Sequence, residues 1–226
     1  MEKNIIGLIL NNKGLNTRMD PFDKEILASV YASNIEPGMS PLDRLRSRFY
    51  LPLDILDEKI RRLISNGLLE QKEPLRLTFL GRDAIKVVLV GGVFDVIHPG
   101  HIHTLKAAKR HGDVLVVVVA RTSTATKIKQ NRKIYHAENL RKELVSSLSL
   151  VDLAIIGSQV SLYDTVERVS PDIIALGYDQ IHSEKEVSQN CKDRNLSVSI
   201  LRLNTPVPGI KSSQIKDELG TSIYGI

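Results

Sequence analysis

Residues 86–101, KVVLVGGVFDVIHPGH, decide the fold of this chain. The apolar residues at the start of this stretch predict a buried strand, and residues 102–110 after it are typical of a helix. Glycine and proline shape the turn between the two elements. Such a junction directs main-chain N–H groups and the positive end of a helix dipole at one spot, which suits a phosphate. His98 and His101 in this turn are candidate donors to phosphoryl oxygens as charge develops during a transfer reaction.

The residues His98-Pro99-Gly100-His101, preceded by Gly92-Val93-Phe94-Asp95, resemble the HxGH signature of the nucleotidyltransferase superfamily, in its cytidylyltransferase-like branch. In that family a phosphorylated acceptor attacks the α-phosphate of a nucleoside triphosphate, and pyrophosphate leaves. A bare H-x-G-H is a weak pattern, but the strand before it and the helix after it make it specific. The alternative is a histidine pair that only bonds neighbouring backbone. The resemblance runs from about Lys86 to Leu219 and implies nucleotide contacts from Val93, Phe94, His98, Pro99, Gly100 and His101.

Composition indicates a soluble intracellular protein of one or two domains. The chain has 226 residues and one cysteine, Cys191, so an internal disulfide is excluded and a reducing cytoplasm is expected. We expect Cys191 to be a surface or half-buried thiol rather than a nucleophile. No secretory signal pattern opens the chain. The longest apolar runs, such as residues 114–120, are too short to span a bilayer, so no membrane contact is expected.

The sequence changes character near residue 84, and we predict a domain over residues 1–84 and another over residues 85–226. The first carries 13 basic and 12 acidic side chains, and the second carries 18 and 14. The positive excess therefore lies with the second segment, where phosphate chemistry is expected.

Residues 1–84 predict three helices, at 22–33, 41–49 and 52–66, with the last closed by Gly67. Two short strands, 68–71 and 75–78, predict a small hairpin. This order resembles a winged helix-turn-helix domain. Asp54, Asp57 and Glu58 in its third helix would be repelled by DNA, although nearby arginines could compensate, namely Arg44, Arg46, Arg48, Arg61 and Arg62. Both a protein-interaction or dimerisation module and a DNA-binding one stay open.

Residues 85–226 alternate between strands and helices. Strands are expected at 87–90, 114–120, 153–156, 173–176 and 197–201, and helices at 102–111, 137–147, 161–169 and 184–194. Continuous apolar strands separated by helices predict an α/β fold, a doubly wound parallel sheet of the Rossmann-like nucleotidyltransferase type. Ligands bind such sheets beyond the carboxyl ends of the strands.

A basic loop follows the second predicted strand. A charge run is usually a solvated surface, but this one leaves the ligand-binding end of a strand, and the matching loop of glycerol-phosphate cytidylyltransferases carries phosphate-binding lysines. We therefore predict catalytic roles for Lys129, Arg132 or Lys133. In the next helix, Arg141 either holds the preceding loop by an ion pair or contacts the ligand.

Two further motifs carry candidate nucleotide-binding residues. Residues 171–180, PDIIALGYDQ, resemble archaeal FAD synthases, and Gly177 and Asp179 there suit recognition of a base or ribose. Asp179 could instead only cap the turn. Residues 209–216 are similar to the family's G-I-S-[ST]-T-x-I motif, in which Ser212 or Ser213 would cap a helix whose N–H groups face the β- and γ-phosphates.

The resemblance implies an enzyme that transfers AMP from ATP to FMN to give FAD and pyrophosphate. An alternative is a CTP-dependent enzyme acting on glycerol phosphate or a similar phosphorylated alcohol. A second alternative is a DNA-binding regulator that responds to a flavin or nucleotide. No dense carboxylate cluster is seen, so we expect Mg²⁺ to be carried by the nucleotide rather than by a metal site of the protein. A homodimer stays open.

Overall fold

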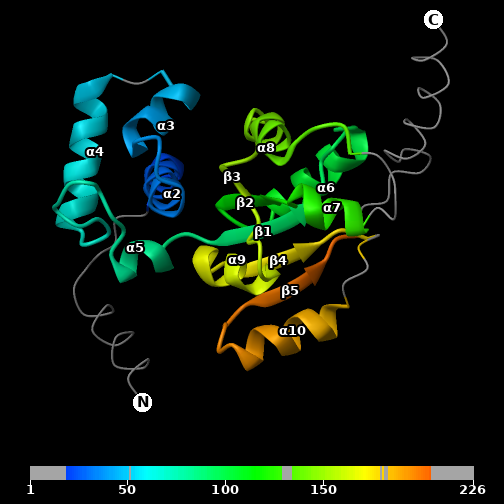
Figure 1. The fold of residues 1–226 in the computed structure, drawn as a ribbon. Helices are drawn as coiled ribbons and strands as arrows, with labels where there is room; N and C mark the ends of the chain where they lie inside the picture. The colour runs from blue at the N-terminus through cyan, green and yellow to red at the C-terminus, as the bar shows by residue number, and fades with distance from the viewer. Residues whose placement is uncertain (1–18, 51, 129–133, 179, 181–182, 205–226) are drawn as a thin grey trace, which may run out of the picture.

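The computed structural model describes residues 19–50, 52–128, 134–178, 180 and 183–204. Its centre is a parallel five-stranded sheet in the order β3-β2-β1-β4-β5 (Figure 1). The strands are β1 (Val87–Gly92), β2 (Val114–Val119), β3 (Leu153–Ile156), β4 (Ile173–Leu176) and β5 (Ser199–Arg202). The predicted α/β fold with a doubly wound parallel sheet is confirmed. The order of strands reverses between β1 and β4, which is where ligands bind in sheets of this kind.

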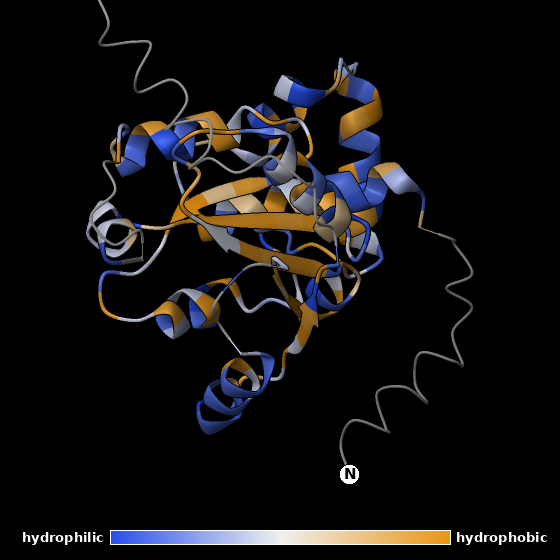
Figure 2. Ribbon diagram, turned by 90° about the vertical axis from the view of Figure 1, so that its right-hand side faces the viewer, coloured by the Kyte–Doolittle hydropathy of each residue, from blue (hydrophilic) through white to orange (hydrophobic). Residues whose placement is uncertain are grey.

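Helices cover both faces of the sheet, as continuous apolar strands require. They are α6 (Pro99–Lys109), α7 (Thr122–Ile128), α8 (Glu138–Ser146), α9 (Leu162–Val169) and α10 (Glu184–Asp193). Buried side chains of α6 and α8 pack on one face, and those of α9 and α10 pack on the other. Figure 2 shows the strands as hydrophobic and the helices as mixed. Cys191 on α10 is 1% exposed, so the expectation of a surface or half-buried thiol is wrong.

The segment before the sheet contains α2 (Pro21–Ile35), α3 (Pro41–Arg48), α4 (Leu53–Ser65) and α5 (Phe79–Asp83). Asp20 caps α2 in a reciprocal pair with Asp23, and α4 is followed by Gly67 at φ +72°. The expected hairpin is reduced to one antiparallel bridge between Leu69 and Leu77. The order of these elements is that expected of a winged helix-turn-helix, and this assignment stays a prediction.

Three aspartates fix this helical segment to the edge of the sheet where the strands begin. Each aspartate lies directly before a strand, and its carboxylate accepts a main-chain N–H at the start of the neighbouring strand. The donors are Lys86 for Asp113 (2.8 Å), Leu115 for Asp152 (2.6 Å) and Val87 for Asp172 (2.6 Å). Each also binds a cation of the helical segment, with Lys24 at 2.7 Å from Asp113, Arg48 at 2.6 Å from Asp152 and Arg82 at 3.1 Å from Asp172. Figure 1 shows α2 to α5 at this edge, away from the strand arrowheads.

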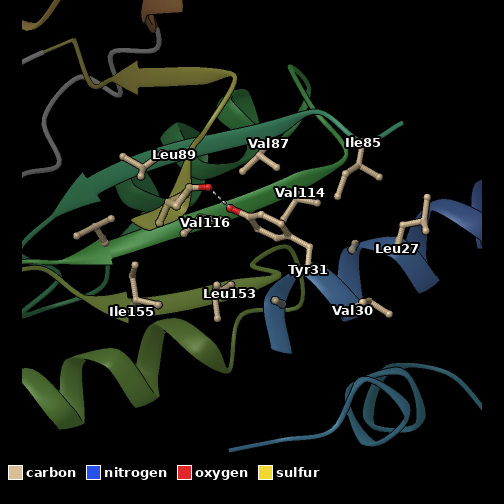
Figure 3. Packing of buried hydrophobic residues seen from close by; sticks show 14 of the residues in the cluster. Leu27, Val30, Tyr31, Ile85, Val87, Leu89, Val114, Val116, Leu153 and Ile155 are labelled. Carbon is tan, nitrogen blue, oxygen red and sulfur yellow. Dashed lines mark hydrogen bonds between the residues drawn. The ribbon is translucent and has the colours of Figure 1, made fainter. Parts of the chain in front are cut away.

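Helix α2 also contributes to the core of the sheet. Leu27, Val30 and Tyr31 are buried in one hydrophobic cluster with residues of β1, β2 and β3 (Figure 3). The Tyr31 hydroxyl donates to the carbonyl of Val169 at 2.6 Å, and burial raises the pKa of this phenol. The predicted boundary at residue 84 therefore divides segments that share a core, and the division into two domains stays a prediction.

Within the ranges given above, no helix has both the length and the apolar character that crossing a membrane requires.

Candidate active site

His98 and His101 lie where the loop after β1 leads into α6, at the carboxyl edge of the sheet. His98 is the N-cap residue of α6, with Pro99 and Gly100 in its first turn. The rings of His98 and His101 lie 3.9 Å apart between centroids. Both are half-buried beside the amino end of the helix, where the helix dipole favours an anion. The structure thus brings together these four of the predicted nucleotide-binding residues.

Phe94 is the buried aromatic residue of this turn. Its backbone is in the left-handed region at φ +54°, and its side chain is 4% exposed. The ring lies 5.1 Å from the ring of His101 between centroids. A Cβ atom on Gly92 would come within 2.7 Å of two ring carbons of Phe94, so the motif needs glycine there. Phe94 therefore acts on the site by supporting His101 from inside the protein.

Asp95 joins this turn to the segment that precedes α8. Its carboxylate, in a residue 5% exposed, accepts the main-chain N–H of Tyr135 at 3.0 Å and that of His136 at 3.0 Å. The Nδ1 atom of His136 lies 2.9 Å from the carbonyl oxygen of Asp95. Sequence reasoning did not assign a role to Asp95. Its position beside the histidine motif was the available signal.

Arg141 on α8 holds the same two segments together. Its side chain is fully buried, and its Nη1 and Nε atoms donate to the carbonyls of Val93 (2.6 Å) and His136 (2.9 Å). Burial lowers the pKa of this guanidinium, while Asp95 and Glu138 oppose that effect. Arg141 thus holds these segments together, as one of the two expectations has it, but through carbonyl oxygens and the hydroxyl of Thr122 (3.4 Å) rather than through the expected ion pair. Val93 thus contributes its main-chain carbonyl as the acceptor that Arg141 binds.

Gly177 and Gln180, which follow β4, lie at the same edge of the sheet as the end of β1. Gly177 is buried, and its N–H donates to the side chain of Gln180 at 3.2 Å. The same side chain donates to the carbonyl of Gly91 on β1 at 2.6 Å. Arg202 on β5 donates to the carbonyls of Gly177 (2.8 Å) and Gln180 (3.0 Å). Gly177 thus lies at the same edge as the histidine pair, as predicted, whereas sequence reasoning missed the roles of Gln180 and Arg202.

Six predicted site residues fall outside the described part of the chain: Lys129, Arg132, Lys133, Asp179, Ser212 and Ser213. The structure therefore leaves their predicted contacts with phosphate, base or ribose as predictions. The described residues include no group of three or more His, Cys, Asp and Glu side chains that could hold a metal ion. Asp95, next to the motif, uses its oxygens for N–H groups.

Comparison with known proteins identifies the family. The model of the family described as cytidylyltransferase-like matches residues 89–218, which include the histidine pair. The FAD synthase of Aciduliprofundum boonei is 47% identical over 116 residues, 51% of this chain and 76% of that protein. The FAD synthase of Picrophilus torridus is 41% identical over 126 residues, 56% of this chain and 89% of that protein.

A solved structure shows the same fold. The lipopolysaccharide core biosynthesis protein from Thermoplasma volcanium GSS1 is 43% identical, with a TM-score of 0.52, and the match covers 54% of this chain and 99% of that one. These matches agree with the parallel sheet, with the reversal of its strand order between β1 and β4 (the switch point), and with the paired histidines at the start of α6. Together they leave one assignment. The chain belongs to the cytidylyltransferase-like family and is a nucleotidyltransferase.

Proposed function

We propose that the protein is an FAD synthase that transfers AMP from ATP to FMN and releases pyrophosphate. The observation that carries the proposal is the paired histidines at the switch point of a chain 41–48% identical to several proteins named FAD synthase. The lone cysteine, Cys191, fits the reducing cytoplasm, where we expect the enzyme to act.

In the proposed reaction, an oxygen of the FMN phosphate attacks the α-phosphorus of ATP. The bond from that phosphorus to the oxygen bridging to the β-phosphate breaks, and pyrophosphate leaves with the electron pair. The attacking phosphate is already anionic at neutral pH, so no general base is required. The protein contributes alignment for in-line attack and stabilisation of the charge that develops on the α-phosphate.

We expect the groups for these tasks to meet at one edge of the sheet, where the structure places His98 and His101. His98 and His101 would donate to oxygens of the α-phosphate at the amino end of α6, where the helix dipole favours an anion. Lys129, Arg132 and Lys133 would neutralise the leaving pyrophosphate, and Ser212 or Ser213 would cap a helix that faces the β- and γ-phosphates. Asp179 with Gly177 would contact the base or ribose.

A divalent cation such as Mg²⁺ would arrive on the triphosphate, where it neutralises phosphate charge. The donor set agrees with this, since Asp95, the buried carboxylate of the motif, accepts N–H groups of Tyr135 and His136.

The alternative substrate pair is CTP with glycerol phosphate or a similar phosphorylated alcohol. It is favoured by residues 127–141, which resemble the corresponding stretch of glycerol-phosphate cytidylyltransferases and in which Arg141 donates to the carbonyls of His136 and Val93. Both substrate pairs use the same histidine chemistry, so the choice between them depends on base and acceptor recognition.

The regulator hypothesis has less support from the geometry. Of the five arginines that could offset the acidic start of α4, three bind within the protein. Arg44 donates to Ser33 and to the carbonyl of Glu36, Arg48 binds Asp152, and Arg62 binds Asp23. We therefore propose that α2 to α5 serve mainly as a packing partner of the sheet. A protein partner or a second copy of the chain at this segment stays a prediction.

Parallel assays test the proposal. The purified protein is given ATP with FMN in one reaction and CTP with glycerol phosphate in another, and FAD, the CDP-alcohol and pyrophosphate are measured. We expect FAD from the first pair, and product from the second pair alone would contradict the proposal.

Variants of the histidines link the activity to the site. His98→Ala or His101→Ala should lower kcat by about 100- to 1000-fold, the usual loss for one donor to developing charge. His103→Ala is the matched control, because His103 lies exposed on the same helix. Full turnover in both site variants would contradict the role given to the pair.

A further inference from the structure

The strands on either side of the switch point pair over a short length only. β1 and β4 are in register at Val88 with Ile173 and at Leu89 with Ile174. β1 continues to pair with β2 as far as Gly92. The two central strands therefore part before their carboxyl ends, and this opening leads to the site that holds the nucleotide in such folds.

The side chain of Gln180 bridges this opening. Its Oε1 atom accepts the N–H of Gly177 at 3.2 Å, and its Nε2 atom donates to the carbonyl of Gly91 at 2.6 Å. A primary amide has one acceptor and one donor side, as a peptide group has. Gln180 thus bonds the β4 loop and β1 in the way that a peptide unit of an intervening strand would.

Gly177 and Gln180 are themselves held in place by further hydrogen bonds. Nη1 of Arg202 donates to the carbonyls of Gly177 and Gln180, and Nε of Arg202 lies 3.1 Å from a carboxylate oxygen of Glu184 at the start of α10. The main chain of Gln180 also donates to the carbonyl of Gly177 at 3.2 Å. The bridge is therefore anchored on β5 and α10 as well as on β4.

We propose that Gln180 is a positioning residue that fixes the distance between the end of β1 and the β4 loop, and with it the width of the nucleotide site. This inference rests on the proposed function for the identity of the ligand. β1 runs directly into the turn of Phe94 and His98, so a displaced Gly91 would move the histidine pair relative to the β4 loop. A displacement of about 1 Å in such a site can cost 100-fold in rate.

The neutral amide of Gln180 donates on one side, to Gly91, and accepts on the other side, from Gly177. Gln180→Leu keeps the approximate size and removes both bonds. Gln180→Glu keeps the shape, but its carboxylate would place a negative oxygen against the carbonyl of Gly91. When protonated, the introduced carboxyl group can donate to Gly91 and accept from Gly177, as the amide does.

The test measures kcat and KM for the nucleotide from pH 5.5 to 8.5 in the wild-type protein and three variants. We expect kcat/KM to fall about 10- to 100-fold in Gln180→Leu at every pH. Gln180→Glu should match that loss at high pH and regain activity relative to the wild type as the pH falls. Gln189→Leu is the control, because Gln189 lies exposed on α10 and bonds only Asp193 among the described contacts.

Two kinetic results would overturn the inference: Gln180→Leu with wild-type kinetic constants, or Gln180→Glu with a loss that does not change with pH. Calorimetric binding of ATP and of CTP separates this inference from the proposed function. If the wild type makes no FAD, the proposed FAD synthase activity is wrong. The role of Gln180 is then tested by comparing the affinity of the wild type and of Gln180→Leu for whichever nucleotide, ATP or CTP, the wild type binds. Equal affinity of the wild type and Gln180→Leu for that nucleotide, or binding of neither nucleotide by the wild type, would also overturn it. Hydrogen exchange at residues 88–92 and 174–178 should rise in a folded Gln180→Leu protein.

Discussion

Gly92 shows how closely the backbone of the active-site turn is determined by one side chain. The ring of Phe94 occupies the space that a Cβ atom at position 92 would need, with two ring carbons at 2.7 Å from that point. Phe94 takes a left-handed backbone conformation to place its ring there, at a cost of about 1–3 kcal/mol. This arrangement supports His101, whose ring lies 5.1 Å from that of Phe94.

We predict that Gly92→Ala destabilises the protein by about 1–3 kcal/mol, the usual cost of overpacking, and lowers turnover by displacing Phe94 and His101. Unfolding in urea and steady-state turnover measure the two effects. Gly91→Ala is the matched control for stability, because a Cβ atom at Gly91 meets nothing within 4 Å. Equal stability losses in the two variants would show that a general property of the strand, rather than the ring of Phe94, sets the requirement for glycine.

At the scale of elements, Glu36 connects the end of α2 to two helices of the sheet segment. Its carboxylate binds Lys142 of α8 at 2.6 Å and also binds Arg168 of α9. Burial raises the pKa of Glu36, but the hydrogen bonds and charges of Lys142 and Arg168 outweigh it, and the pKa lies below its usual value of 4.5. A lowered pKa in the folded state means that the ionised carboxylate stabilises the fold.

The stabilisation by Glu36 should therefore be fully present above its unfolded pKa and lost as the pH falls through the lower folded value. We predict that Glu36→Gln lowers the free energy of unfolding by about 1 kcal/mol at pH 7, and that the difference from the wild type shrinks below about pH 4.5. Urea unfolding of both proteins from pH 3 to 8 measures this. A difference that is constant over this range would contradict the ion-pair explanation.

The main elements were predictable because periodicity and capping residues mark them. β2 is six consecutive buried residues, and α2 begins at Asp20-Pro21, a local signal of a helix start. Helix α7 was missed, because Thr122 to Thr126 has no apolar period and only Ala125 of it is buried. Helix α5 was missed because it is short and is defined by the cap from Thr78 to Gly81.

The histidine pair was predictable for the same local reason, since Gly, Pro and His follow a strand within one turn. The bonds of Gln180 to Gly91 and of Arg141 to Val93 were not, because they join residues 89 and 48 positions apart. A single sequence carries no signal of which distant carbonyl a side chain reaches. The sequence therefore located the histidine pair, whereas only the structure revealed which distant contacts hold the segments around it.

At the scale of the whole molecule, the helical segment and the sheet are joined by a core as well as by charges. Tyr31 of α2 is 4% exposed and lies in the same hydrophobic cluster as Val114, Val116 and Leu153 (Figure 3). Ion pairs at Asp113, Asp152 and Asp172 hold the same two parts together at the amino edge of the sheet. Because the contact is largely apolar, we expect the two parts to unfold as one cooperative unit.

We predict that Tyr31→Ala destabilises the protein by about 3–5 kcal/mol, as loss of a buried aromatic ring usually does. The change should increase hydrogen exchange in β2 and β3 as much as in α2 and α3, although Tyr31 belongs to α2. Tyr50→Ala is the matched control, because Tyr50 is fully exposed in the same segment and its loss should change neither quantity. If Tyr31→Ala increased exchange in the helical segment alone, the two parts would be independent domains and α2 would be a removable addition. Cooperative loss of protection would instead mean that this chain uses α2 as a structural part of its nucleotidyltransferase fold.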